Sequence, residues 1–210
     1  SLHHISHNFD HAANDESQFP QKLRAVSNAN FERLPSDSDL LHTAFEQNAV
    51  SLRPDAIALE FLHANGTRTL WSYQTLDKIA NRIAHQLRHH QVGVEDIVPI
   101  HITKSPMFYA SILGVLKAGA AFAPVHPELP DARKELMVKD LGPKVILCTQ
   151  DLLTPEAQTS AIVVDVSNLE ELRLAESETC EAPLIENLTT ANLAYCLYTS
   201  GSTGVPKAVS

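Results

Sequence analysis

Cysteine, long apolar runs and basic clusters are all scarce in this 210-residue sequence. Its three cysteines are unevenly spaced and form no C-x-x-C pair, so neither a disulfide framework nor a thiol metal site is expected. Cys148 and Cys196 lie in apolar runs, which predicts buried free thiols in a reducing compartment. No stretch approaches the roughly 18 apolar residues of a membrane span, and no signal peptide is recognisable. We therefore expect a cytoplasmic protein without a membrane partner.

The charge balance is acidic, with a formal net charge of −9 and a pI near 5.6. No stripe of lysine or arginine is available to neutralise phosphates along a nucleic acid, so we expect no nucleic-acid partner. Apolar residues make up 44% and charged residues 20%, as is usual for a globular protein. The length suits one large α/β domain, or one domain and a linker.

Residues 1–39 are polar and show no sustained period of 3.6 or 2, so we interpret them as an interdomain linker. This segment contains His3, His4, His7 and His11, of which pairs spaced by four could share a helix face. No cysteine or carboxylate pattern completes a ligand set there, and we predict no metal site.

From residue 40 onward, predicted strands and helices alternate. The Asn65-Gly66 turn indicates an antiparallel hairpin, while the later alternation indicates βαβ units. The fold class expected is therefore α/β, a mostly parallel sheet flanked on both faces by helices. The predicted strands are Ile57–Phe61, Thr69–Trp71, Ile97–Ile102, Ala120–Val125, Lys144–Cys148, Ala161–Val166 and Leu193–Tyr198. Four helices are predicted: one from a Ser38/Asp39 cap towards Val50, one from a Ser72 cap until Gly93 stops it, one that Ser105-Pro106 opens and that runs through Lys117, and one from Pro130 or Asp131 to Leu141. The Ser72-capped helix has an apolar face and a polar face, and the polar face carries Asp77, Lys78, Asn81, Arg82, Gln86 and Arg88.

The last predicted strand runs directly into a loop of hydroxyl residues and glycines. Two glycines allow backbone N–H groups to turn inward as a nest for anionic oxygens, and nearby hydroxyls add neutral donors. Lys207 then supplies one mobile positive charge, although the order of residues differs from a Walker A motif. The pattern predicts a phosphate-binding loop, and a solvated turn is the alternative. The candidate phosphate-binding residues are Thr199, Ser200, Gly201, Ser202, Thr203 and Gly204, with Lys207 as the candidate catalytic residue.

The string YTSGSTGVPK, residues 198–207, resembles the phosphate loop of the adenylate-forming (AMP-binding) superfamily, with Ala208 where that family has glycine. WSYQTL at 71–76 and NRIA at 81–84 resemble the first core motif of nonribosomal peptide synthetase adenylation domains. LKAGAAFAPVHP at 116–127 resembles the second, with His126 in place of an aspartate. We interpret both core motifs as packing segments, in which Gly119 ends a helix and Pro124 and Pro127 follow a strand.

This resemblance implies that residues 40–210 are the N-terminal part of an amino-acid-activating adenylation domain, with residues 1–39 linking it to a condensation domain. The parent would use ATP and Mg²⁺ to form an aminoacyl adenylate, which passes to the phosphopantetheine of a downstream carrier domain. Single residues resemble fungal siderophore synthetases, so a siderophore-type peptide is the expected secondary metabolite.

The family's amino-acid pocket, ribose contacts and C-terminal lysine follow the phosphate loop. The 210 residues alone are therefore expected to be inactive, as an incomplete N-terminal part of the large subdomain. Two alternatives stay open at this point: an acyl-CoA or aryl-acid ligase of the same superfamily, and a non-catalytic nucleotide-binding remnant.

Overall fold

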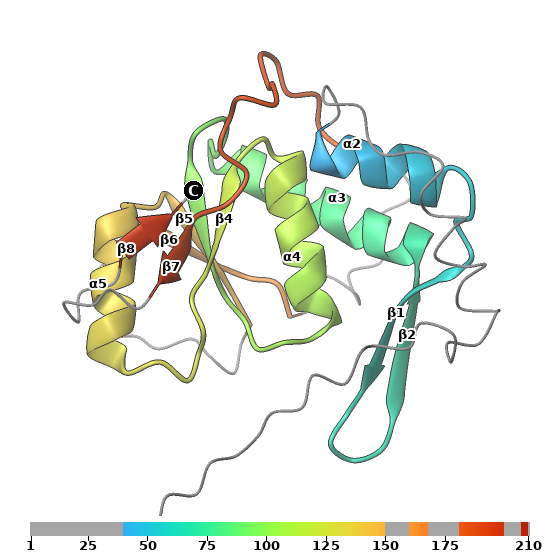
Figure 1. Ribbon diagram of the computed structural model, residues 1–210, viewed down its shortest axis with the longest axis horizontal. Helices are drawn as coiled ribbons and strands as arrows, with labels where there is room; N and C mark the ends of the chain where they lie inside the picture. The colour runs from blue at the N-terminus through green and yellow to red at the C-terminus, as the bar shows by residue number, and fades with distance from the viewer. Residues whose placement is uncertain (1–39, 150–159, 168–180, 200–206, 210) are drawn as a thin grey trace, which may run out of the picture. The chain divides into compact units, whose positions relative to one another are not determined.

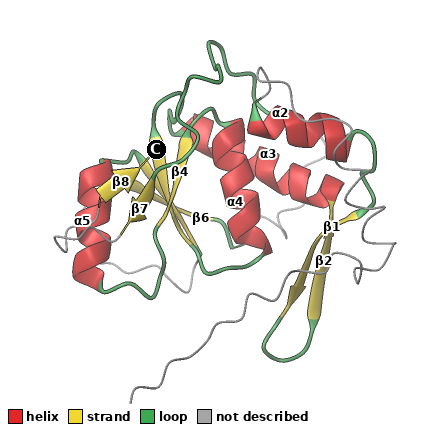
Figure 2. Cartoon of the chain, in the orientation of Figure 1, coloured by secondary structure: helices red, strands yellow, loops and turns green. Residues whose placement is uncertain are grey.

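The computed structural model describes residues 40–149, 160–167, 181–199 and 207–209. These residues form a parallel sheet with helices on both faces, preceded by an antiparallel hairpin and followed by a second one (Figures 1 and 2). The α/β fold class expected from the sequence is confirmed. The expected linker 1–39 and its histidines lie outside the described residues.

The first helix, α2, spans Leu41–Phe45 and continues as a π-helical segment, η2, over Glu46–Val50. A helix towards Val50 was expected, but the Ser38/Asp39 cap is wrong. Leu40 holds the N-cap position and forms no side-chain cap hydrogen bond. Instead, the Thr43 hydroxyl donates to the Leu40 carbonyl oxygen at 2.8 Å, which ties the first turn together.

Strands β1, Ile57–Leu62, and β2, Arg68–Ser72, form the predicted antiparallel hairpin. At its turn, Asn65 Oδ1 accepts hydrogen bonds from the Thr67 amide at 3.0 Å and the Thr67 hydroxyl at 2.7 Å. Gly66 takes a φ of +82°, a left-handed conformation that favours glycine. The local Asn-Gly signal therefore gives this turn without help from the rest of the chain.

Helix α3, Tyr73–His89, follows β2 directly, and the Ser72 hydroxyl caps it by accepting from the Thr75 amide at 3.1 Å. The apolar face expected from the sequence is buried. The expected end at Gly93 is wrong, because the helix stops at His89 and Gln91 takes a φ of +60°. Part of the predicted polar face is also buried, since Asn81 is only 2% exposed.

Four parallel strands form the central sheet in the order β4-β3-β5-β6. The helices between them are α4 and α5, with α3 and α4 on one face of the sheet and α5 on the other (Figure 1). The strands are β3 Ile97–His101, β4 Ala121–Pro124, β5 Val145–Cys148 and β6 Ile162–Asp165, and the helices are α4 Pro106–Lys117 and α5 Asp131–Leu141.

Local signals at the ends of α4 and α5 behave as predicted. The Ser105 hydroxyl caps α4 by accepting from the Phe108 amide at 3.3 Å, and Pro106 occupies the first turn. Gly119, just past the end of α4, has a φ of +82°, and Gly142 at the end of α5 has a φ of +54°. The chain therefore turns from α4 into β4 within three residues, which fixes the edge strand of the sheet relative to α4.

Helices α3 and α4 approach closely at Gly114. A Cβ atom built on this glycine would lie 2.7 Å from both Cβ and Cγ2 of Ile83 and 2.9 Å from the Ala80 carbonyl oxygen. Ile83 and Ala80 are fully buried, and backbone and Cβ atoms cannot move aside as the end of a flexible side chain would. The backbone of α4 is helical at this position, so glycine is needed for the close packing and not for an unusual backbone conformation.

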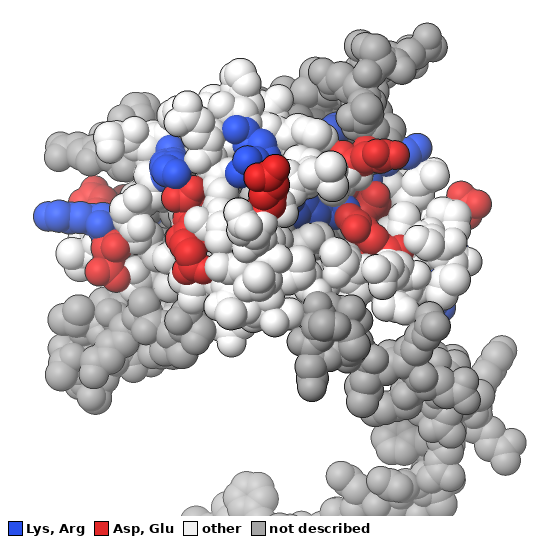
Figure 3. Space-filling view, turned by 90° about the horizontal axis from the view of Figure 1, so that it is seen from above, with Lys and Arg blue, Asp and Glu red and all other residues white. Residues whose placement is uncertain are grey.

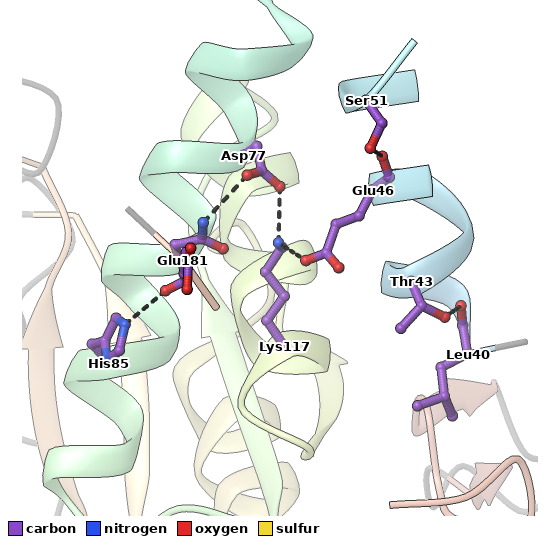
Figure 4. A network of polar contacts seen from close by, with 9 residues as sticks. Leu40, Thr43, Glu46, Ser51, Asp77, His85, Lys117 and Glu181 are labelled. Carbon is purple, nitrogen blue, oxygen red and sulfur yellow. Dashed lines mark hydrogen bonds and ion pairs between the residues drawn. The ribbon is translucent and has the colours of Figure 1, made fainter. Parts of the chain in front are cut away.

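A buried cation joins three helices (Figure 4). Lys117 at the end of α4 is 1% exposed, and its Nζ donates to Asp77 Oδ1 on α3 at 2.8 Å and to Glu46 Oε1 on η2. The second Asp77 oxygen accepts from Asn81 Nδ2 at 3.2 Å. An unpaired ammonium would be very costly at this depth, so Lys117 requires both carboxylates in place.

Other ion pairs lie nearer the surface, such as Arg68–Glu60 and Lys144–Asp96, each at 2.7 Å. On the face seen in Figure 3, acidic and basic side chains lie next to one another. Exposed pairs of this kind contribute at most about 1 kcal/mol each. The Lys117 network is therefore the electrostatic feature with the largest expected effect on stability.

We predict that Asp77→Ala lowers the free energy of unfolding of this chain by about 2–4 kcal/mol, because it leaves a buried ammonium with one carboxylate. Urea unfolding followed by the fluorescence of Trp71, the only tryptophan and 3% exposed, measures this. The control Glu135→Ala removes an exposed carboxylate from α5 and is expected to change stability by less than about 0.5 kcal/mol. Equal stability of the two variants would contradict the role of Asp77.

Gly114→Ala is expected to destabilise the chain by about 1–3 kcal/mol through overpacking against Ile83. The sign of this change in the free energy of unfolding is informative, because alanine in a helix is intrinsically more favourable than glycine by about 1 kcal/mol. The control Gly142→Ala places its Cβ in open space, so only its left-handed backbone opposes the change. A stabilised Gly114→Ala variant in the same urea assay would show that the helices can move apart freely.

Candidate phosphate-loop site

The segment before the predicted phosphate loop lies along the outer edge of the parallel sheet. Residues 194–196 flank β4: the Phe122 amide donates to the Ala194 carbonyl oxygen at 3.2 Å, and the Cys196 amide donates to the Phe122 carbonyl oxygen at 2.9 Å. These bonds form a parallel bridge between Tyr195 and Phe122, whose rings are also in contact with centroids 6.3 Å apart. The segment thus runs in the direction of β4.

A second contact holds the chain just before this edge. The Glu95 carboxylate, in the turn before β3, accepts from Asn192 Nδ2 at 2.8 Å and from the Leu193 amide at 3.3 Å. Glu95 has a φ of +66°, an uncommon backbone conformation for a residue with a side chain. The approach to the loop is therefore anchored to the amino end of the sheet before it pairs with β4.

Beyond Cys196 the chain forms an antiparallel hairpin of β7, Leu197–Thr199, and β8, Lys207–Val209. Thr199 pairs with Lys207 at the loop end of this hairpin, so the backbones of the first and last predicted site residues are neighbours at the base of the loop. The predicted residues Ser200, Gly201, Ser202, Thr203 and Gly204 lie outside the described residues. The two ends of the predicted site are thus neighbours, and the β7–β8 hairpin is the backbone that carries the loop.

The predicted strand Leu193–Tyr198 is only partly correct. It was expected to continue the parallel sheet, whereas its pairing with β4 is confined to the bridge at Tyr195, and from Leu197 onward the backbone pairs with β8. Because Tyr195 is level with Phe122 and β4 ends at Pro124, the hairpin begins where β4 ends. The loop is therefore attached at the carboxyl edge of the parallel sheet, where ligands of such sheets bind.

Tyr198 connects the hairpin to α5. Its hydroxyl donates to Asp140 Oδ2 at 2.7 Å and lies 3.5 Å from the Met137 carbonyl oxygen. Burial, and then the Asp140 carboxylate, raise the pKa of the Tyr198 phenol, so it remains protonated and a donor. No sequence signal marks this pair, because Tyr198 fits an apolar strand pattern and Asp140 is 58 residues away.

The carboxyl ends of the neighbouring strands carry His101 and the loop leading into α5. His101 Nδ1 lies 3.1 Å from the Val125 carbonyl oxygen, and burial lowers the pKa of its imidazole. At the start of α5, Asp131 pairs with Lys134 at 2.7 Å, and this hydrogen bond lowers the pKa of the Asp131 carboxyl. His101 is therefore neutral near pH 7 and tied to the β4 exit through a backbone oxygen.

The described cysteines are free and buried, as expected. Burial raises the pKa of the Cys148 thiol to about 11 and also raises that of Cys196, so neither is a thiolate at neutral pH. Within the described ranges, His, Cys, Asp and Glu side chains form no group suited to hold a metal ion. In the same ranges, none of the helices is long and apolar enough to cross a membrane.

Known proteins resemble this chain over most of its length. It is 53% identical over 196 residues to nonribosomal peptide synthetase 2 of Cochliobolus heterostrophus, covering 93% of this chain and 4% of that protein. It is 33% identical over 217 residues to the ferrichrome siderophore peptide synthetase of Mycosarcoma maydis, covering 91% and 5%. The chain thus spans about a twentieth of the length of these relatives.

Among solved structures, the AMPPNP-bound nonribosomal peptide synthetase FmoA3 matches with a TM-score of 0.64 and 27% identity, covering 89% of this chain and 18% of that one. The N-terminal subdomain of Klebsiella oxytoca NpsA has the same fold, with a TM-score of 0.65 at 23% identity, covering 83% and 42%. Residues 45–210 match the AMP-binding enzyme family, which confirms the resemblance seen in the sequence motifs. The chain belongs to the family of AMP-binding enzymes.

Proposed function

We propose that residues 40–210 are the N-terminal part of an adenylation domain that activates an amino acid in a nonribosomal peptide synthetase. The observation that carries this proposal is the hairpin base at the carboxyl edge of the sheet, where Thr199 and Lys207 bracket a loop of the family's phosphate-binding type. The identity to a peptide synthetase over 93% of the chain supports the same assignment. Residues 1–39 would then link this domain to a preceding condensation domain.

The loop suits a polyphosphate. Ser200, Ser202 and Thr203 offer hydroxyl donors, and Gly201 and Gly204 allow backbone amides to approach an anion. The sequence has no Asp or Glu between Thr199 and Lys207, so no carboxylate of the loop would repel the anion. In the proposed reaction the amino-acid carboxylate oxygen forms a bond to the α-phosphorus of ATP, and the bond from that phosphorus to the departing pyrophosphate breaks. Lys207 and the loop donors would hold the β- and γ-phosphates as negative charge builds on the leaving group.

ATP would bring Mg²⁺, which commonly binds through phosphate oxygens with one or two protein carboxylates. The aminoacyl adenylate would pass to the phosphopantetheine thiol of a carrier domain in the same polypeptide. A relative that makes the siderophore ferrichrome supports a siderophore-type product, hence a role in secondary metabolism. The free buried thiols of Cys148 and Cys196 favour a reducing compartment, the cytoplasm.

The proposed function is tested by ATP–pyrophosphate exchange with the full-length polypeptide that carries these residues. We expect exchange that depends on one or a few amino acids. Exchange driven by aryl or fatty acids, followed by thioester formation on free coenzyme A, would instead identify an acyl-CoA or aryl-acid ligase. Binding of AMPPNP without exchange with any acid would instead identify a non-catalytic nucleotide-binding remnant.

Lys207→Ala in that polypeptide is expected to slow amino-acid-dependent exchange by at least about tenfold, because it removes the positive charge proposed to hold the departing phosphates. The fold should be unaffected, which circular dichroism and thermal melting can verify. Lys78→Ala, on α3, removes one lysine outside the loop and serves as the control. An exchange rate unchanged by Lys207→Ala would rule out the role proposed for this lysine.

A further inference from the structure

We propose that the Tyr198–Asp140 hydrogen bond positions the phosphate loop, by fastening the hairpin that carries the loop to the last turn of α5. This inference rests on the proposed function and adds Tyr198 and Asp140 to it as positioning residues. Neither side chain needs to touch ATP. Their role would be to hold the base of the loop at a fixed place relative to the sheet.

The parallel sheet stops holding the chain after Cys196. The backbone bond from Cys196 to Phe122 is the last bond described between this segment and β4. From Leu197 to Thr199 the ladder bonds go to β8, a strand that belongs to the same two-stranded hairpin. A two-stranded hairpin is at best marginally stable by itself, so it needs a further contact to be held in one orientation.

Tyr198 supplies that contact at the right point. It is the middle residue of β7 and immediately precedes Thr199, the first candidate phosphate-binding residue. Its partner Asp140 lies in the last turn of α5, close to the left-handed end at Gly142. The Met137 carbonyl oxygen, 3.5 Å away, lies one turn earlier on the same helix. The tyrosine hydroxyl is thus directed at a rigid element on the far side of the sheet from α3 and α4.

The chemistry favours a durable bond. The acceptor is a carboxylate, and charge-assisted hydrogen bonds of this kind are stronger than neutral ones. Burial raises the pKa of the Cys196 thiol, and the charge of Asp140 raises it further. The Asp140 carboxylate therefore acts on Cys196 as well as on Tyr198. Alternate residues of a strand face the same side, and Cys196 and Tyr198 therefore both face α5.

The test compares Tyr198→Phe and Asp140→Ala with the full-length wild type in amino-acid-dependent pyrophosphate exchange. Each variant is expected to raise the KM for ATP about three- to tenfold, while the KM for the amino acid changes less than about twofold. The double variant should be no worse than either single one, because both remove the same bond. Asp140→Asn retains a side-chain oxygen acceptor and should recover most of the ATP affinity.

Two controls separate positioning from general damage. Tyr195→Phe removes a hydroxyl from the same segment but keeps the backbone bridge and the ring contact with Phe122. Glu135→Gln removes a carboxylate charge from the same helix, and both variants should leave the KM for ATP unchanged. Hydrogen exchange at the amides of 197–199 and 207–209 should become faster in Tyr198→Phe and Asp140→Ala, with no change in protection across β3 and β5. Loss of protection in all strands would overturn the proposal in favour of a structural role.

An unchanged KM for ATP, or additive effects in the double variant, would also overturn the proposal. Failure of the proposed function has a different signature, in which the wild type supports no exchange with any acid. In that case the affinity for AMPPNP and the amide exchange of the hairpin still test whether the Tyr198–Asp140 hydrogen bond positions the loop. Weaker AMPPNP binding with a loosened hairpin would support the positioning role without the adenylation reaction.

Discussion

The buried ammonium of Lys117 is the constraint on which the rest of this structure depends. It is satisfied only when η2 brings Glu46 and α3 brings Asp77 to the end of α4, so three helices are fixed by one charge. The chain then turns at Gly119 and enters β4, the edge strand of the sheet. The segment that leads to the phosphate loop pairs with β4 at Phe122, five residues after Lys117. The strand segment that leads to the loop is thus linked to the buried charge through a short stretch of chain.

Such a network is expected to specify the arrangement more than to stabilise it. Burying charges costs solvation that the ion pairs recover only in part, so an apolar replacement of the whole network could be equally stable. Apolar packing between α3 and α4 can tolerate small sliding movements, whereas a lysine with two carboxylates at fixed positions cannot. The close approach at Gly114 acts in the same way by allowing only one spacing of the two helices. We interpret both features as devices that select one register between α4 and its neighbours.

Much of the fold follows from short-range sequence signals. Ser72, Ser105 and the Asn65-Gly66 turn act within three or four residues, and each behaves as its sequence predicts. The charged residue in LKAG could not be recognised as buried, because Lys117 is satisfied by partners 40 and 71 residues away. For the same reason the sequence places Asp77 and Asn81 on the polar face of α3 without showing that another helix covers them. Periodicity identifies the polar stripe of a helix, but only the tertiary partner decides whether water or another helix covers it.

The candidate site also combines residues that the sequence reveals with contacts that only the fold determines. The glycines, hydroxyls and lysine of the loop are contiguous, so their chemistry is visible in the sequence. The placement of the loop is not, since it depends on a bridge to Phe122 and a hydrogen bond to Asp140, which lie 73 and 58 residues before their partners. Because the chain leaves the ladder of β4 after Cys196, the parallel sheet no longer holds the hairpin strands β7 and β8 that flank the loop. The contacts at Tyr195 and Tyr198 take the place of that ladder, because they secure the base of the proposed anion-binding loop on two sides through partners that are distant in the sequence.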